Sequence, residues 1–282
     1  MSASGESTLS TFVASDGDNI VIQDWPLESH AQLRGVVILV HGLGEHAGRY
    51  AHVAEQLNRW GFAVRGYDQC GHGESGGPRG SLPTDTRLLD DLADIVDSTR
   101  ARMPKDKPLI VLGHSMGGLV AARFVSLALR PIDGLVLSSP ALDPGLNMVQ
   151  KLLLAVLPKV MPNLRVGNGM KPQYISHDPA VVAAYQADAQ VHDRISGRLG
   201  RFIATAGLKV SELAPHWPVQ TLLLYAGDDR LLNPAGSRRF AAAAPANMVR
   251  AICFESLYHE LFNELDAQPV FAALQQWLDE KF

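Results

Sequence analysis

Short runs of apolar and β-branched residues alternate along the chain with segments whose apolar residues recur every three or four positions. Gly35–Val40 is apolar throughout, which is typical of a strand buried on both faces of a sheet. Similar runs predict further strands at 62–67, 109–112, 135–137, 221–225 and 249–254. Helical spacing predicts helices at 50–60, from a cap at Thr84 to Thr99, at 116–129 and at 268–277. Strands that alternate with helices predict a mostly parallel sheet covered by helices on both faces.

The segment before residue 35 has a different pattern. Two short apolar runs, 12–14 and 20–25, flank the turn sequence Asp16-Gly-Asp-Asn. Such an arrangement predicts an antiparallel hairpin. We expect this hairpin at one edge of the sheet, which then has eight strands.

The alternation of strands and helices breaks between about residues 141 and 218. This stretch has scattered Pro and Gly, helical pieces and no convincing strand. The simplest interpretation is a core of residues 1–140 and 218–282 with a helical insertion at 141–217. The insertion would form a lid over the strand ends, where ligands bind in open α/β sheets.

The segment 146–157 is predicted to be a lid helix with few polar positions. Leu146, Val149, Leu153 and Val156 would pack on the core, and a second apolar surface would be formed by Leu152, Leu154 and Leu157. That second surface favours the wall of an apolar binding site that also dips into a lipid surface. A helix that is simply buried on both sides explains the pattern equally well.

Composition and charge exclude several classes of protein. A net charge of −4 and the lack of any Lys/Arg cluster argue against a nucleic-acid binder. Cys70 and Cys253 lie far apart and show no metal-ligand spacing, which suits a reducing compartment. Residues 1–10 do not resemble a signal peptide, and the longest apolar run is too short to cross a bilayer. We therefore expect a cytoplasmic protein without a metal or another cofactor.

One glycine pattern imitates a dinucleotide-binding site. Gly42-Leu-Gly44-Glu-His-Ala47 follows a predicted strand, and Asp68 ends the next strand, where a ribose-binding acid would be expected. However, the pattern comes after a hairpin, and Glu45 would place negative charge beside a pyrophosphate. A nucleotide site is therefore not favoured.

The most informative motif is Gly113-His-Ser-Met-Gly117, between a predicted buried strand and a helix. G-x-S-x-G in this context is a nucleophile elbow, whose tight turn exposes the serine hydroxyl above the sheet. The helix that follows places its N-terminus near any negative charge that develops. Ser115 is therefore the predicted nucleophile.

A serine hydroxyl needs a base, and the base needs an orienting acid. In this fold both partners follow the serine in the chain. Of the histidines after Ser115, only His259 lies beyond the last predicted strand, so it is the predicted base. The acid is predicted at Asp228 or Asp229, after the strand at 221–225, with Asp143 as a weaker candidate.

The tetrahedral intermediate also needs hydrogen-bond donors for its oxyanion. The backbone N–H of Met116, directly after the nucleophile, is one predicted donor. The loop after the strand Gly35–Val40 can supply the second from Leu43. This role also explains the glycines that imitate a nucleotide site.

Four sequence blocks resemble the monoacylglycerol lipases and the related lysophospholipase-like serine hydrolases of the α/β-hydrolase superfamily. They are 41–50, HGLGEHAGRY; 113–118, GHSMGG; 226–231, AGDDRL; and 258–264, YHELFNE. The resemblance implies the α/β-hydrolase fold and a triad of Ser115, Asp229 and His259, because the family's Asp-Arg-Leu aligns with 229–231. Glu45 and Arg49 match charged residues near the family's glycerol end, although a structural ion pair explains them equally well. Phe262 stands where vertebrate members carry a histidine.

Together these features predict a hydrolase that cleaves carboxylic esters of lipids through an acyl-enzyme on Ser115. The resemblance implies monoacylglycerol as the substrate, cleaved to glycerol and a fatty acid. A lysophospholipase, a general carboxylesterase and an aminopeptidase-type relative are the alternatives on the same fold. A non-catalytic ligand-binding protein is disfavoured because all three triad residue types are present. The expected partners are a small lipid ester and, transiently through the lid, a membrane surface.

Overall fold

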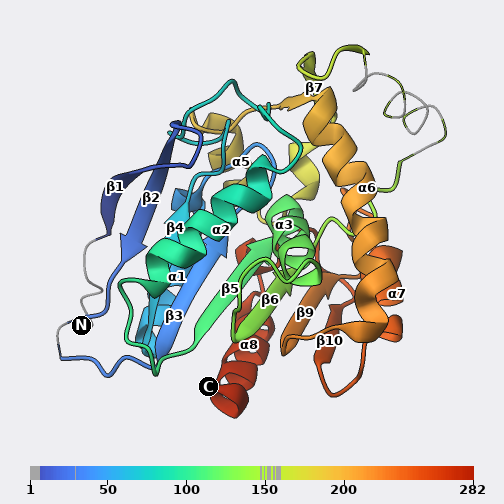
Figure 1. Cartoon of the computed structure of the whole chain (residues 1–282). Coiled ribbons are helices and arrows are strands. Elements are labelled where there is room, and N and C mark those ends of the chain that lie inside the picture. Colours follow the sequence, from blue (N-terminus) through green and yellow to red (C-terminus); the bar gives the residue numbers. More distant parts are fainter. Residues whose placement is uncertain are drawn as a thin grey trace.

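Eight strands form one sheet in this computed structural model, which describes residues 7–28, 30–146, 148, 150, 154, 156 and 160–282 (Figure 1). The strand order is β1-β2-β4-β3-β5-β6-β9-β10. From β3 onward every pairing of neighbours is parallel. The strands span Thr8–Val13 (β1), Asn19–Trp25 (β2), Gly35–Val40 (β3), Phe62–Tyr67 (β4), Leu109–His114 (β5), Gly134–Ser138 (β6), Thr221–Ala226 (β9) and Val249–Phe254 (β10). The predicted eight-stranded, mostly parallel sheet is confirmed.

The predicted hairpin forms the edge of the sheet. β1 and β2 pair antiparallel, and β2 pairs antiparallel with β4. Gly17 in the turn has φ +91°, a conformation that favours glycine. β1 begins at Thr8, earlier than the apolar run at 12–14, because backbone pairing with β2 continues where the side chains are exposed.

Helices cover both faces of the sheet, and each face has its own apolar core (Figure 1). Ile38 of β3 packs into one core, while its neighbours Val37 and Leu39 pack into the other. This alternation explains why the central strands are apolar at consecutive positions. The first core includes side chains of α2 (Arg87–Arg100), α3 (Ser115–Ser126), α6 (Gly197–Leu213) and α7 (Ala235–Ala243); the second includes those of α1 (Ala51–Arg59) and α8 (Gln268–Lys281).

Two of the predicted helices are too long at one end. Thr84 does not cap α2; the N-cap position belongs to Thr86, whose hydroxyl donates to the Asp90 carboxylate at 2.7 Å in the first turn. The helix predicted to reach residue 129 ends at Ser126, and Ala128 has φ +50°, which is incompatible with a continuing helix. Apolar periodicity continues past both points, so the pattern alone could not locate them.

The chain between β6 and β9 contains two short strands that the sequence did not predict. Arg165–Gly167 (β7) and Arg194–Ser196 (β8) pair antiparallel in a separate sheet. Each has three residues, too few for a periodic pattern to be recognised. The same stretch contains the short 3-10 helices Pro172–Tyr174 (η2) and Ala214–His216 (η3) and the helices α5 (Pro179–Ala187) and α6. α6 packs closely against the chain after β6 at Gly207. A Cβ at this position would lie only 2.1 Å from the Leu142 carbonyl oxygen.

Most of the predicted lid helix at 146–157 lies outside the described residues. The positions not described include Val149, Leu152, Leu153 and Leu157. Of the positions described, Val156 is 54% exposed, so its predicted packing on the core is wrong. Leu154 lines a cavity with Leu146. No helix in the described part of the chain has the length and apolar content to cross a bilayer.

Because both faces of the central sheet are buried, loss of a leucine from a central strand should lower the free energy of unfolding more than loss of a leucine from the edge strand β1. Leu223 of β9 is fully buried, whereas Leu9 of β1 is 62% exposed. We expect Leu223→Ala to lower the free energy of unfolding by about 2–5 kcal/mol, and Leu9→Ala by about 0.5 kcal/mol or less. Urea denaturation of both variants measures this difference. Equal losses in the two variants would contradict the assignment of Leu223 to the core.

Candidate active site

A sharp turn places Ser115 at the junction of β5 and α3. Ser115 has φ +52°, in the left-handed region that costs a non-glycine residue about 1–3 kcal/mol. Two glycines make the turn sterically possible. A Cβ on Gly117 would lie 2.1 Å from the Val40 carbonyl oxygen, and one on Gly113 would lie 2.5 Å from the Gly117 carbonyl oxygen. The predicted elbow is therefore present in the backbone.

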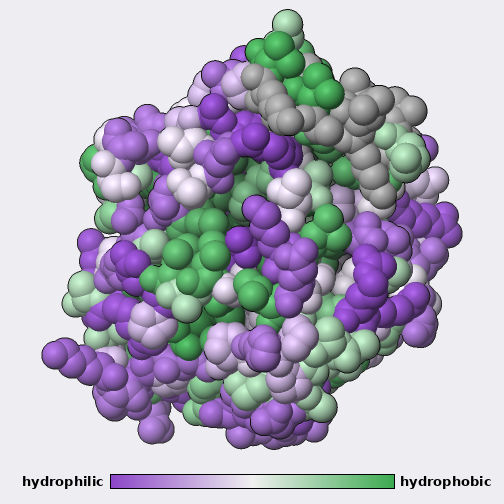
Figure 2. Space-filling view, turned by 45° about the vertical axis from the view of Figure 1, so that its right-hand side comes forward, coloured by the Kyte–Doolittle hydropathy of each residue, from purple (hydrophilic) through white to green (hydrophobic). Residues whose placement is uncertain are grey.

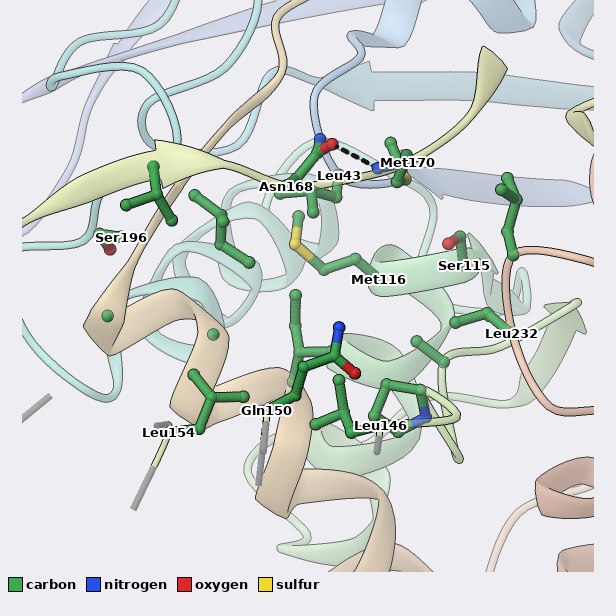
Figure 3. A pocket seen from close by; sticks show the side chains of 18 of the residues that line it. Leu43, Ser115, Met116, Leu146, Gln150, Leu154, Asn168, Met170, Ser196 and Leu232 are labelled. Carbon is green, nitrogen blue, oxygen red and sulfur yellow. Dashed lines mark hydrogen bonds between the residues drawn. The ribbon is translucent and has the colours of Figure 1, made fainter. Parts of the chain in front are cut away.

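Ser115 faces a cavity of about 280 Å³ (Figure 3). His259, Leu43 and Met116 line the same cavity, so the predicted nucleophile, base and oxyanion loop converge. Most of the remaining wall is apolar and comes from the chain between β6 and β9: Leu146, Leu154, Val166, Met170, Ile195 and Ile203. An apolar wall beside a serine and a histidine suits an acyl group bound for attack.

His259 is oriented by Asp229. The ring Nδ1 and the Asp229 Oδ2 lie 2.7 Å apart, and both side chains are buried. The other carboxylate oxygen accepts the backbone N–H groups of Leu231 and Leu232, each at 2.9 Å. On the histidine side, the N–H of Glu260 donates to the Ile175 carbonyl at 2.8 Å. Asp229 and His259 are thus fixed from both loops, which follow the adjacent parallel strands β9 and β10.

The other two acids considered lie elsewhere. Asp228 forms an ion pair with Arg230 at 3.0 Å. Asp143 pairs with Arg239 at 2.7 Å and accepts from the Asn233 amide at 3.0 Å. Of the three aspartates, the structure brings Asp229 to His259.

The charges around His259 favour its role as an oriented base. Burial of the ring opposes protonation, but the adjacent Asp229 carboxylate outweighs it and raises the pKa of His259 above its usual value. Burial likewise opposes ionisation of Asp229, but His259 and the two backbone N–H groups lower the pKa of Asp229. Burial, with the neighbouring His259 as a second cause, lowers the pKa of His114 to about 4. His114 is therefore neutral near pH 7 and adds no competing charge.

The loop after β3 is held so that its backbone faces the cavity. The Glu45 carboxylate accepts the Gly42 N–H at 2.5 Å and the Tyr50 hydroxyl at 2.7 Å. Gly44, with φ +78°, accepts the N–H of His192 on its carbonyl at 2.9 Å. None of the turn and loop hydrogen bonds of the described residues uses the N–H of Leu43. That group is available to an oxyanion beside Met116.

His41 supports the same loop in a defined tautomer. Its Nε2 accepts the Gln69 N–H at 2.9 Å, so its Nδ1 carries the proton and donates to the Gly42 carbonyl at 2.8 Å. Asp68, the acid of the apparent nucleotide pattern, instead accepts the N–H groups of Ala47 and Glu74, each at 2.8 Å. The glycines and Asp68 therefore shape a loop around backbone hydrogen bonds.

Glu45 and Arg49 belong to a buried charge cluster with Glu260. The Arg49 guanidinium contacts Glu45 and makes two hydrogen bonds of 2.8 Å with the Glu260 carboxylate. Burial opposes ionisation of Glu45, but Arg49 outweighs it and lowers the pKa of Glu45 to about 2. Neither Glu45 nor Arg49 lines the cavity at Ser115.

Glu260 was not predicted as part of the site. Its sequence signal was its place after His259 in the block 258–264, which does not reveal a partner more than two hundred residues earlier in the chain. Within the described residues, no three His, Cys, Asp or Glu side chains are grouped to hold a metal ion.

The chain is similar to known hydrolases over nearly its whole length. It is 34% identical to a monoacylglycerol lipase of Mycolicibacterium smegmatis, covering 95% of each protein. It is 30% identical to the phospholipase YtpA of Bacillus subtilis, covering 87% of this chain and 95% of that protein. A crystal structure of the Paleococcus ferrophilus monoacylglycerol lipase matches with a TM-score of 0.81 and 32% identity, covering 99% of this chain and 100% of that one.

These similarities confirm the resemblance that the four sequence blocks indicate. Residues 31–266 also match the family described as serine aminopeptidase, S33. The chain therefore belongs to this family and is a hydrolase with the α/β-hydrolase fold.

Proposed function

We propose that this protein hydrolyses carboxylic esters of lipids, with monoacylglycerol as its substrate and Ser115, Asp229 and His259 as its catalytic triad. The observation that carries the proposal is the 2.7 Å contact between His259 and Asp229 beside the cavity that Ser115 also lines. A neutral imidazole whose Nδ1–H is held by a carboxylate has Nε2 free to accept the serine proton.

The reaction follows from these positions. His259 accepts the Ser115 proton as Oγ attacks the ester carbonyl carbon, and the backbone N–H groups of Leu43 and Met116 stabilise the oxyanion. The intermediate collapses to an acyl-enzyme as His259 returns the proton to the leaving alcohol. Water, deprotonated by His259, then attacks the acyl group, and the fatty acid leaves with Ser115 restored.

The choice of substrate rests on the cavity and on the relatives. The apolar wall suits one acyl chain, and the similar proteins of Mycolicibacterium smegmatis and Paleococcus ferrophilus are monoacylglycerol lipases. The phospholipase YtpA of Bacillus subtilis supports a lysophospholipase as the second candidate. Both reactions release a fatty acid from a lipid with one acyl chain, and they differ in the alcohol.

For Glu45 and Arg49 we propose the structural role. Both Glu45 oxygens are already engaged, by Arg49 on one side and by Gly42 and Tyr50 on the other. Contact with glycerol would require these bonds to break inside the protein, at a cost in free energy. The pair therefore holds the loop that carries Leu43.

We also propose that residues 141–217 form a lid that touches a lipid surface. This segment exposes several apolar side chains: Met148 (80%), Val160 (69%), Met161 (55%), Val166 (45%) and Leu164 (44%). Figure 2 shows hydrophobic side chains gathered at the upper end of the molecule. An exposed apolar group beside a lipid-binding cavity favours transient, peripheral contact with a membrane.

The triad predicts the effect of removing the nucleophile. We expect Ser115→Ala to lower kcat for a monoacylglycerol about 10⁴- to 10⁶-fold, because no other group can form the acyl-enzyme. Ser126→Ala, on the same helix but outside the cavity, is the matched control and retains activity. Fatty-acid release and labelling by a fluorophosphonate probe measure the effect. Substantial turnover by Ser115→Ala would refute the mechanism.

The raised pKa of His259 predicts the pH profile. The base must be neutral, so kcat/KM for a soluble ester falls as the pH decreases through a midpoint above 6.5. Asp229→Asn removes the carboxylate that raises this pKa, so the midpoint moves to lower pH and kcat falls about 10⁴-fold. A profile whose midpoint is the same in both proteins would show that Asp229 does not act on the base.

The lid proposal predicts a loss that depends on the form of the substrate. We expect the double variant Met161→Ser and Leu164→Ser to bind vesicles about tenfold more weakly, because it removes two of the exposed apolar side chains of the lid. Its activity falls on vesicle-borne monoacylglycerol and is retained on a soluble short-chain ester. The control is Leu213→Ser, which also removes an exposed leucine. Leu213 is the last residue of α6, whereas Leu164 contacts the first residue of that helix, Gly197. Equal activity of the double variant and the parent on vesicles would exclude this surface.

A further inference from the structure

A buried carboxylate, that of Glu264, joins the loop that carries His259 to the chain between β6 and β9. The Glu264 side chain is 1% exposed. Its Oε1 accepts the backbone N–H of Tyr258 at 2.7 Å. The same oxygen lies 2.9 Å from Nδ1 of His177, and Oε2 accepts the backbone N–H of His177 at 3.2 Å. An ionised carboxylate can only accept hydrogen bonds, so both oxygens are used by donors from these two segments.

These contacts fix the backbone on one side of His259. Tyr258 precedes the histidine and Glu260 follows it, and the N–H of Glu260 donates to the Ile175 carbonyl at 2.8 Å. The two backbone N–H groups that flank the base are therefore both held. The Ile175 carbonyl belongs to the backbone and remains after a substitution, whereas the carboxylate of Glu264 can be removed.

The side chain of Tyr258 is held in the same place. Its ring stacks on the ring of His177, with 3.6 Å between the centroids and 23° between the planes. Next to His177, the Ser176 hydroxyl donates to the Asn263 carbonyl at 2.8 Å. Glu264 contacts both members of the stacked pair, so it lies where the two segments meet.

The position of the loop matters because a base acts only within hydrogen-bond reach of the proton that it accepts. Asp229 fixes one edge of the His259 ring, but the backbone at 259 determines where the side chain starts. Misplacement of a catalytic group by about 1 Å can lower a rate about a hundredfold. Glu264 is not among the described residues that line the cavity at Ser115, so any effect on the reaction passes through Tyr258.

We propose that Glu264 is a positioning residue, which aligns His259 with Ser115 by holding the Tyr258 N–H against the chain between β6 and β9. This inference rests on the proposed ester hydrolysis and adds a residue outside the triad on which the rate depends. Alignment of the base is needed in the transition state and not for binding of the ester. Loss of Glu264 therefore lowers kcat and kcat/KM together and leaves KM nearly unchanged.

The first experiment compares two substitutions with para-nitrophenyl butyrate as the substrate. Glu264→Leu removes both acceptor oxygens, whereas Glu264→Gln retains one for the Tyr258 N–H. We expect Glu264→Leu to lower kcat about tenfold to a hundredfold with KM within about threefold of the parent, and Glu264→Gln to stay within about threefold of the parent in both. Complete labelling with a fluorophosphonate probe counts the folded sites, so that kcat is expressed per labelled site.

The matched control is Asp133→Leu. The Asp133 carboxylate also accepts a backbone N–H at 2.7 Å, that of Leu109. Leu109 begins β5, at the end of the strand opposite to Ser115. We expect this variant to have a lower Tm and the kcat per labelled site of the parent. A purely structural role of Glu264 predicts the same result for Glu264→Leu, and that result would overturn the inference.

A milder variant, Glu264→Asp, tests the position even if Glu264→Leu does not fold. It keeps the negative charge and shortens the side chain by one methylene group. We expect kcat per labelled site to fall about threefold to tenfold, because the carboxylate no longer reaches the Tyr258 N–H in the same geometry. A value equal to that of the parent would overturn the inference.

Failure of the proposed function gives a different result. A parent protein that neither cleaves the ester nor is labelled by the probe refutes ester hydrolysis by Ser115 itself. A parent protein that does both, with Glu264→Leu equally fast per labelled site, refutes only the role of Glu264.

Discussion

The close approach of β3 to the first turn of α3 is the contact on which the site depends. Gly117 allows it, because a Cβ there would collide with the Val40 carbonyl oxygen at 2.1 Å. β3 and β5 are hydrogen-bonded neighbours in a parallel sheet, so their carboxyl ends meet at one edge. The backbone alone therefore brings Leu43, Ser115 and Met116 together around one cavity.

The chain between β6 and β9 contacts both loops of the site. On the base side, the Ile175 carbonyl accepts the N–H of Glu260, next to His259. On the oxyanion side, the N–H of His192 donates to the Gly44 carbonyl. The same chain supplies most of the apolar wall, so binding of an acyl chain and alignment of the catalytic loops share one structural support.

Sequence reasoning succeeded where a short local pattern determines the structure. The strands that are apolar at consecutive positions and the glycine turn at Ser115 belong to this kind. Asp229 and His259, which the chain order indicated, lie in contact in the structure. It failed where structure depends on contacts between distant segments. β7 and β8 form a sheet by pairing with each other across the segment that contains α5. The start of α2 at Arg87, by contrast, is a local detail that the apolar spacing did not resolve.

The residues of the site that the sequence did not indicate have the same origin. Asn168 lines the cavity where its backbone N–H donates to the Asp193 carbonyl, and no motif around residue 168 in the sequence indicates this position. Glu260 is held by Arg49, which lies on the 3-10 helix Ala47–Tyr50 (η1) after β3. Pairs of this sort become visible only once the fold has brought them together.

Arg49 limits which substitutions its two acidic partners can tolerate. Its guanidinium lies between the carboxylates of Glu45 and Glu260, all three largely withdrawn from water. Loss of the cation alone would leave two like charges facing each other in a poorly solvated space, and loss of one acid would leave the cation with half of its compensation. Replacement of one of these residues by a neutral one therefore leaves a buried charge uncompensated, whereas replacement of all three together does not.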